Sequence, residues 1–254
     1  MEITASTTVA AIAAAEPATI KVFQRHHIDF CCGGRIPVSE ACADHDLDTD
    51  TLLAELRAVR AAADDPADWR LAPLKDLVAH IQTRYHVPLR AELPRLSAMM
   101  EKVVSRHGQR LPETLLPLQA TFESLQRELL EHMAKEDAVL FPAVLALEAT
   151  GAADVAATNW AWIQQPIEVM EAEHEAAGAA LATMRTLTHG YAPPEEACPT
   201  FRGLYYGLSE LERDMHTHVH LENHVLFPRA SRLAHAVARD QTGSYGANGS
   251  RVGV

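Results

Sequence analysis

Apolar residues recur every three or four positions along four long segments of the chain. This spacing is typical of helices that bury one face. Stretches that contain Gly and Pro separate the segments, so the sequence predicts four helices joined by short connections. Such helices favour an up-and-down antiparallel bundle. The predicted helices cover residues 73–105, 113–148, 166–188 and 199–236.

The second and fourth helices are two copies of one pattern. HMAKEDAVLFP occupies residues 132–142 and HVHLENHVLFP occupies residues 218–228, with His, Glu, Val, Leu, Phe and Pro in equivalent places. In each copy, a His and a Glu four residues later interrupt the apolar stripe. Side chains four residues apart lie on one face of a helix, so both residues are expected to point into the bundle. The two pairs are His132 with Glu136 and His218 with Glu222.

The first and third helices each place one further His in the apolar stripe, His86 and His174. A buried carboxylate without a partner costs on the order of several kcal/mol, so Glu136 and Glu222 need a compensating positive charge. A single His on an apolar face is usually a core residue satisfied by its neighbours, but four such His on four stripes favour metal ligation. The pattern predicts two metal ions, each bound by two His, with both carboxylates as bridges. The predicted ligands are His86, His132, Glu136, His174, His218 and Glu222.

The donor atoms narrow the choice of metal. Imidazole and carboxylate ligands without thiolate suit iron or manganese, and zinc is also compatible with them. Two carboxylate-bridged ions would retain unfilled coordination positions, where a small diatomic molecule or an oxo group could bind. The sequence therefore favours a reactive centre over a purely structural one.

Composition shifts divide the chain into three parts. Residues 1–62 predict a small all-α domain, and an acidic, Pro-containing linker follows near residue 61. The bundle is expected to cover residues 70–237. The Gly- and Ser-rich residues 240–254 predict a disordered tail.

Two adjacent thiols are the main feature of the N-terminal domain. Gly33 and Gly34 follow Cys31 and Cys32, which predicts that the thiols lie at a helix end or in a tight turn, accessible to solvent. The thiols could be small turn residues or a redox-active or iron-handing pair, with His26 and His27 nearby to lower a thiol pKa. A later helix, beginning with Thr49 or Asp50 as its cap, completes this domain.

The composition excludes several functional classes. The net charge of −12, with only 22 Lys and Arg residues, argues against binding to nucleic acid or an anionic membrane. No apolar run approaches the roughly 18 residues of a membrane span, and the Ala-rich start lacks the basic segment of a signal peptide. The four Cys form no obvious disulfide framework, which indicates a reducing compartment and a cytoplasmic protein.

Three other features bear on the bundle. Pro88 lies within the first predicted helix and is expected to kink it, at about 3 kcal/mol relative to Ala, either re-aiming His86 or being absorbed by a local bend. His80 is close enough to His86 for a supporting role. His216, His220 and His224 step by four opposite the His218 stripe and predict a solvated face, whereas Cys42 and Cys198 are interpreted as structural.

The motifs together resemble a known family, the di-iron Repair of Iron Centres proteins (YtfE, ScdA and DnrN). The resemblance rests on RYH ending at His86, LEHMAKED around His132, MEAEH ending at His174, HVHLENHVLFP from His218, and DFCCGG at residues 29–34. It covers nearly the whole chain apart from the tail.

The resemblance implies a hemerythrin-like bundle with a non-heme di-iron centre, oxo- and carboxylate-bridged, and the same six ligands. It also implies repair of iron-sulfur clusters damaged by nitric oxide or oxidants, and suggests a homodimer. Two acids, Glu128 and Glu173, match family positions on the route from solvent to the metals. Helical geometry puts Glu128 one turn before His132 and Glu173 beside the stripe, where a solvated helix face is the alternative explanation.

Three functions follow as hypotheses. The first is a di-iron protein that repairs iron-sulfur clusters by donating iron, by reducing nitric oxide, or by both, with Glu128 and Glu173 relaying protons and the thiols returning electrons. The second is a non-catalytic carrier or sensor of oxygen or nitric oxide. The third is an adaptor whose bundle binds no stoichiometric metal.

Overall fold

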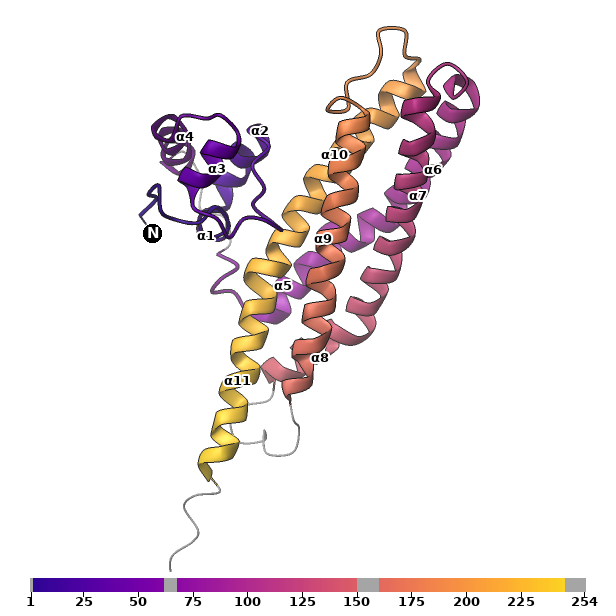
Figure 1. Cartoon of the computed structure of the whole chain (residues 1–254). Helices are drawn as coiled ribbons and strands as arrows, with labels where there is room; N and C mark the ends of the chain where they lie inside the picture. Colours follow the sequence, from indigo (N-terminus) through magenta and orange to yellow (C-terminus); the bar gives the residue numbers. More distant parts are fainter. Residues whose placement is uncertain (1, 62–67, 150–159, 245–254) are drawn as a thin grey trace, which may run out of the picture.

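The computed structural model describes residues 2–61, 68–149 and 160–244. Their regular secondary structure is helical, apart from one isolated bridge between Thr8 and Pro37. The prediction of an all-α protein is confirmed. Figure 1 shows a small N-terminal unit beside a long bundle. No helix in the described part of the chain combines the length and the hydropathy needed to cross a bilayer.

The bundle consists of four helical rods, and three of them contain one π-helical turn each. The first rod comprises α5 (Leu74–Ile81), η2 (Gln82–His86) and α6 (Val87–His107). The second comprises α7 (Pro112–Lys135), η3 (Glu136–Leu140) and α8 (Phe141–Ala149). The third is α9 (Gln164–Leu187), preceded by the short η5 (Trp160–Ile163). The fourth comprises α10 (Pro199–Leu221), η6 (Glu222–Leu226) and α11 (Phe227–Ser244).

Each π turn ends two residues before a proline, at Pro88, Pro142 and Pro228. Proline has no N–H to donate, and its ring clashes with the carbonyl four residues earlier, so a regular α-helix is disfavoured there. The wider turn pairs the preceding N–H with a carbonyl five residues back, as in the bond from Val87 to Gln82. The effect expected of Pro88 is thus absorbed locally, and the rod continues.

The N-terminal unit is built from short helices around its own core. Its elements are α1 (Val9–Ala15), η1 (Pro17–Thr19), α2 (Ile20–Arg25), α3 (Val38–Asp44) and α4 (Thr49–Ala61). Asp48 caps α4 by accepting the Thr51 N–H at 2.8 Å, which corrects the predicted cap at Thr49 or Asp50. A separate cluster of buried residues fills the bundle.

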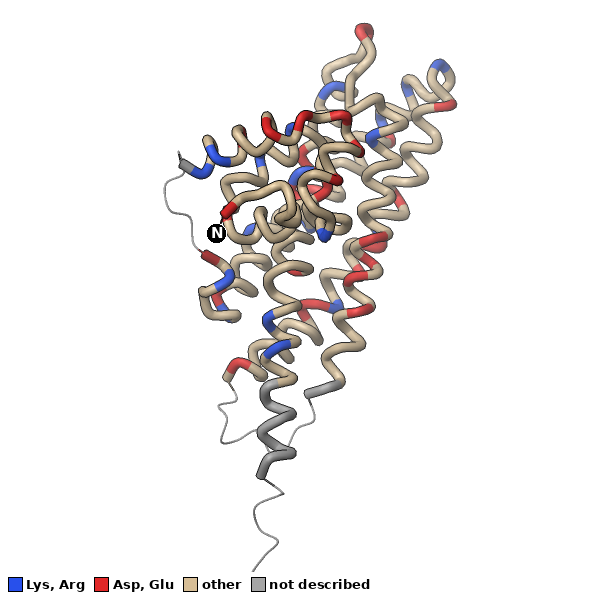
Figure 2. The backbone as a smooth tube through the Cα atoms, turned by 60° about the vertical axis from the view of Figure 1, so that its left-hand side comes forward, with Lys and Arg blue, Asp and Glu red and all other residues tan. Residues whose placement is uncertain are grey.

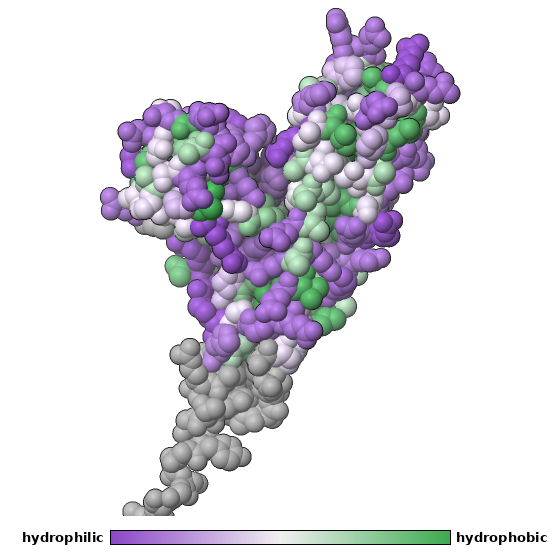
Figure 3. Space-filling model, viewed as in Figure 1, coloured by the Kyte–Doolittle hydropathy of each residue, from purple (hydrophilic) through white to green (hydrophobic). Residues whose placement is uncertain are grey.

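The two units meet along α10 and η6. Figure 3 shows the N-terminal unit standing off from the upper bundle and merging with it further down. Figure 2 shows Asp and Glu residues on both units, in keeping with the net charge of −12. Helix α11 reaches Ser244, beyond residue 240, where the sequence predicted the tail to begin; residues 245–254 and the linker at 62–67 lie outside the described part.

The prediction of a solvated His face on α10 was wrong. His220 is buried, and its Nδ1 donates to the Phe30 carbonyl at 2.9 Å, while His224 Nε2 donates to the Cys31 carbonyl at 2.7 Å. His216 lies edge-on to the Phe30 ring at 6.1 Å. The pattern of one helix cannot show that a second unit covers its outer face. Burial lowers the pKa of His220 to about 4, so it is a neutral donor.

The thiols lie in a tight turn, as predicted, but Cys31 is buried rather than accessible. Asp29 shapes the turn by accepting the N–H groups of Cys31, Cys32 and Gly33 at 2.8–3.0 Å. A Cβ on Gly34 would lie 2.8 Å from the Phe30 backbone, so the turn requires glycine there.

The expected lowering of a thiol pKa by nearby His is also wrong for Cys31. Its contact with the Cys32 sulfur at 3.7 Å, together with burial, raises the pKa of the Cys31 thiol well above its ordinary value. His26 instead pairs with Glu55 at 3.1 Å. Cys31 is therefore a neutral thiol, and Cys32 is the partly exposed member of the pair.

Phe30→Ala should destabilise the protein by about 3–5 kcal/mol, because the ring is buried and packs on Phe23 and His220. Urea unfolding of the whole chain measures this change. Leu71→Ala is the matched control, since Leu71 is 82% exposed and should change stability by no more than about 0.5 kcal/mol. Equal stabilities for the two variants would contradict a stabilising role for Phe30 in the contact between the two units.

Candidate metal centre

The structure brings the six predicted ligands together at the middle of the bundle. His86 ends the π turn η2, Glu136 begins η3 and Glu222 begins η6. His174 comes from the middle of α9. All six side chains are at most 5% exposed: His86, His132, Glu136, His174, His218 and Glu222.

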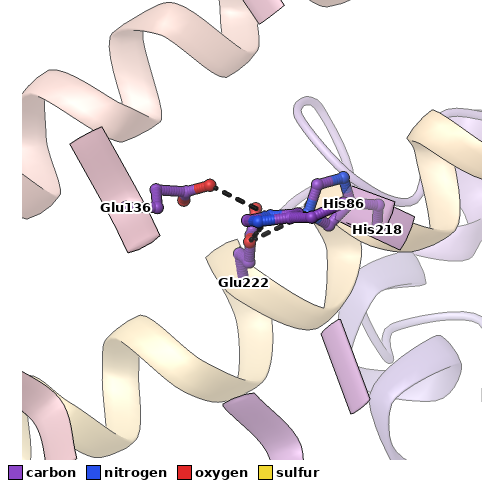
Figure 4. A group of neighbouring side chains, drawn as sticks. All are labelled: His86, Glu136, His218 and Glu222. Atoms are coloured by element: carbon purple, nitrogen blue, oxygen red, sulfur yellow. Dashed lines mark hydrogen bonds and ion pairs between the residues drawn. The ribbon is translucent and has the colours of Figure 1, made fainter. Parts of the chain in front are cut away.

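These residues form two groups that share both carboxylates. One group contains His86 and His218 and the other contains His132 and His174, and each also contains Glu136 and Glu222. Within each group, one ligand atom from every residue lies within 4.8 Å of all the others. Figure 4 shows the first group, with the four side chains converging from three rods.

Each group would surround one metal ion, and the places of the two ions are here called the first and the second position. In the first position, the His86 and His218 Nε2 atoms lie 3.2 Å apart. His86 Nε2 lies 3.4 Å from Glu136 Oε2, and His218 Nε2 lies 3.0 Å from Glu222 Oε1. Donor atoms that surround one ion at about 2.1 Å are spaced at about 3–3.4 Å. The spacing therefore fits a single ion held by these four residues.

The second position has the same arrangement with the other two oxygens. The His132 and His174 Nε2 atoms lie 3.0 Å apart. His132 Nε2 lies 3.4 Å from Glu136 Oε1, and His174 Nε2 lies 3.1 Å from Glu222 Oε2. Each carboxylate thus directs one oxygen toward each position, which is the arrangement of a bridging ligand.

The chemistry of the buried carboxylates tests the fit to metal ions. Both oxygens of Glu136 and Oε2 of Glu222 are buried without a hydrogen-bond donor among the described residues. Burial and Glu222 oppose ionisation of Glu136, but contacts with His132 and His86 outweigh them and lower its pKa. Burial also opposes the charge of Glu222, yet His218 and His174 hold its pKa well below the ordinary value. Ionised carboxylates with unused acceptor capacity fit metal cations.

Three of the four His are oriented through their second ring nitrogen. His86 Nδ1 donates to Asp137 at 3.1 Å, and Asp137 in turn accepts from Gln82 and Arg90. His132 Nδ1 donates to Glu173 at 2.8 Å. His174 Nδ1 donates to Asn223 Oδ1 at 2.7 Å. Such partners fix the ring orientation that a metal requires.

Asp137 and Asn223 were not among the residues predicted from the sequence, although the repeat contained a signal. Each directly follows the buried Glu of its copy, Glu136 or Glu222. A polar residue one position beyond a buried ligand points toward the neighbouring helix, where it reaches a His of another rod. A search for polar pairs at equivalent places of the two copies would have found them.

Aromatic rings pack against three of the four His. Phe141 stacks on His86 with centroids 5.4 Å apart, and Phe227 stacks on His174 at 5.9 Å. Tyr85 lies parallel to His218 at 5.1 Å. His80 contacts Tyr85 edge-on at 5.9 Å, so the support expected of it reaches the ligands only through that ring.

A cavity of about 480 Å³ between α7 and α9 reaches the second position. Glu128, Glu173, Lys135, His132 and His174 are among its lining residues. Glu173 joins Lys135 Nζ at 2.5 Å to the His132 ring. Glu128 is exposed and accepts from Ser124 Oγ at 2.8 Å. The cavity is thus a path for a small molecule, with both acids beside it.

Comparison with known proteins gives the same architecture. The hemerythrin HHE cation binding domain family matches residues 77–230, and the ScdA_N domain, a domain of unknown function, matches residues 5–60. The iron-sulfur cluster repair protein YtfE of Yersinia pseudotuberculosis serotype IB (strain PB1/+) is 40% identical over 225 residues.

The chain belongs to the YtfE family. The alignment covers 87% of this chain and 95% of the relative, so both units are included. YtfE of Yersinia pestis (strain Pestoides F) shows the same identity and coverage. The residues of the centre lie within the matched hemerythrin domain.

The metal-free form of this YtfE-family protein should lose stability as the pH rises. Burial opposes the charge of His132, but Glu136 and other acids outweigh it and raise the pKa of His132 from 6.5 to about 9. Stability from such a shift is fully present below about pH 6.5 and is lost as the pH passes about 9. Urea unfolding across this range measures it. His132→Gln should flatten the dependence, and a flat wild-type profile would contradict the assignment.

Glu136→Ala and Glu222→Ala should each lose the metal pair or its bridge and leave a less stable bundle, because each removes a donor from both positions. Elemental analysis and the visible spectrum measure the loss. Glu123→Ala on α7 is the control, since Glu123 is exposed and bonds only Gln119 among the described hydrogen bonds. Unchanged occupancy and spectra in both ligand variants would refute the assignment.

Proposed function

We propose that this protein repairs damaged iron-sulfur clusters and that it does so with a pair of non-heme iron ions bridged by Glu136 and Glu222. The observation that carries the proposal is the sharing of both buried carboxylates between two pairs of His. The 40% identical relatives are iron-sulfur cluster repair proteins, which supports the same conclusion. When bound, the iron pair would supply redox chemistry and open coordination positions.

The donor set favours this function over the two alternatives. Within the described residues, each position offers two His and the shared acids, without the additional His expected of an oxygen carrier. An adaptor with an inert bundle would not need ionised carboxylates at its centre, because they cost stability unless compensated. The carrier or sensor and the adaptor therefore gain no support from the site.

The cavity between α7 and α9 favours reaction with a small diatomic molecule such as nitric oxide or oxygen. It gives access to the position of His132 and His174. Glu173 Oε2 accepts a hydrogen bond from His132 Nδ1 at 2.8 Å. Glu128 is exposed and lines the same cavity. We assign to these two acids the movement of protons between solvent and the centre.

Reduction of two nitric oxide molecules to nitrous oxide and water consumes two electrons and two protons. Oxidation of Cys31 and Cys32 to a disulfide releases the same numbers. The Sγ atoms lie 3.7 Å apart, and the Cys32 sulfur contacts the His174 carbonyl at 3.6 Å. These contacts support a role for the thiols as reductant. Iron donation to a damaged cluster is the parallel route of repair and requires release of iron.

The partners and setting follow from this role. We propose damaged iron-sulfur proteins as clients, the cytoplasm as the compartment and a homodimer as the assembly. The acidic surface supports the absence of nucleic acid from this set, because a net charge of −12 repels phosphate backbones.

Metal analysis of anaerobically purified protein, with visible and Mössbauer spectra, tests the proposal. Two irons per chain with the signature of a coupled, oxo-bridged pair are expected. Turnover of nitric oxide under reductant then separates the proposed function from a carrier. Absence of iron, or one stoichiometric zinc, would overturn the proposal in favour of the adaptor.

Changing Cys31 and Cys32 to Ser should leave the iron content intact and impair cluster repair in cells, because neither sulfur belongs to either ligand group. Recovery of an iron-sulfur enzyme activity after exposure of cells to nitric oxide measures repair. Cys198→Ser, which alters a half-buried thiol elsewhere in the bundle, is the control. Unimpaired repair by the double variant would reduce the thiols to structural turn residues.

A further inference from the structure

The two halves of the bundle differ at the position directly before a candidate ligand in the first and third rods. Tyr85 precedes His86 in the first rod, and Glu173 precedes His174 in the third. The residues that follow the bridging acids, Asp137 and Asn223, keep the same role in both halves, since each accepts from a ligand His. Among the described residues, the hydrogen-bond support of the four His is therefore unequal where Tyr85 stands in place of an acid.

On the acidic side, Glu173 anchors a ligand of the second position. Its Oε2 accepts the His132 Nδ1 proton at 2.8 Å, and its Oε1 accepts from Lys135 Nζ at 2.5 Å. The lysine fixes the carboxylate, and the carboxylate fixes the imidazole. Asn223 fixes the other ligand, His174, in the same position.

On the aromatic side, Tyr85 presents a ring face instead of an acceptor. The Tyr85 and His218 rings lie 5.1 Å apart with an angle of 3° between their planes. His218 Nδ1 is buried from solvent and has no hydrogen-bond partner among the described residues. Of the two His in the first position, His86 alone has a hydrogen-bond partner for its Nδ1 among the described residues, and that partner is Asp137.

Removal of one such partner costs a metal site about 10–100-fold in affinity, because the partner fixes the ring and makes the imidazole more basic. We propose that the two positions are unequal: the position of His86 and His218 binds its metal more weakly than that of His132 and His174, by about tenfold or more. Tyr85 and Glu173 are the positioning residues that set this difference.

The inference deepens the proposed function and rests on it. A repair protein that donates iron benefits from one ion that leaves and one that stays to keep the centre assembled. The weaker position is then the source of donated iron. The cavity with Glu128 and Glu173 reaches the tighter position. The small molecule would therefore bind at one position, and iron would be donated from the other.

The difference concerns equilibrium affinity and not the rate of release. The cavity opens toward His132 and His174, whereas Tyr85 covers His218. A chelator could therefore reach the tighter position sooner. Anaerobic titration of the metal-free whole chain with ferrous iron, in competition with a ferrous chelator of known affinity, measures both binding constants at equilibrium.

Two isosteric variants assign the constants to positions. Glu173→Gln should lower the tighter constant about tenfold and leave the weaker one in place, whereas Asp137→Asn should lower the weaker one. Tyr85→Phe keeps the ring and should change neither. Tyr85→Glu supplies an acid at the place equivalent to Glu173 and should raise the weaker constant. Glu168→Gln, an exposed acid on α9, controls for the loss of charge.

Diffraction with anomalous scattering from crystals loaded with one equivalent of iron gives an independent readout. The iron peak is expected beside His132 and His174. Equal occupancy of both positions, two equal constants, or a loss of the weaker constant in Glu173→Gln would overturn the inference while leaving the iron pair intact. Failure of the wild-type chain to bind two irons would overturn the proposed function as well.

Discussion

Two carboxylates buried at the centre of a helical bundle are the constraint on which the rest of the structure depends. Glu136 and Glu222 are fully enclosed and ionised, and they repel each other. Burial of like charges is tolerated only if positive charge of comparable strength lies between them. The four ligand His, their hydrogen-bond partners and the stacked aromatic rings all follow from this requirement.

The convergence of the six candidate ligands could be predicted from the sequence, because each His and Glu pair lies within one rod. Spacing along a single helix fixes which residues share a face, and the duplication repeats that information. The hydrogen bonds of Asp137, Glu173 and Asn223 to the His do not follow from that spacing, because each joins two different rods. Those contacts depend on how each helix is rotated about its own axis. The apolar stripe shows which face is buried, but it does not fix this rotation closely enough to pair individual side chains.

The wrong predictions share a different cause. His220 and His224 have helical spacing typical of a solvated face, and Cys31 lies in a Gly-rich turn typical of an exposed loop. Both assignments treated each unit as if it stood alone. The seam between the units buries the His rings against backbone carbonyls of the thiol turn, so residues from distant parts of the chain satisfy one another. Periodicity carries no information about such contacts between units.

The three π turns make the helical geometry of the rods uneven along their length. A π turn is a less regular form of helix, and each one here is followed by a proline that removes a further backbone bond. The π turns contain His86, Glu136 and Glu222, and α-helix flanks each of these turns. The backbone therefore departs from regular α-helical hydrogen bonding at the places where the candidate ligands converge, and the rods continue as α-helices on either side.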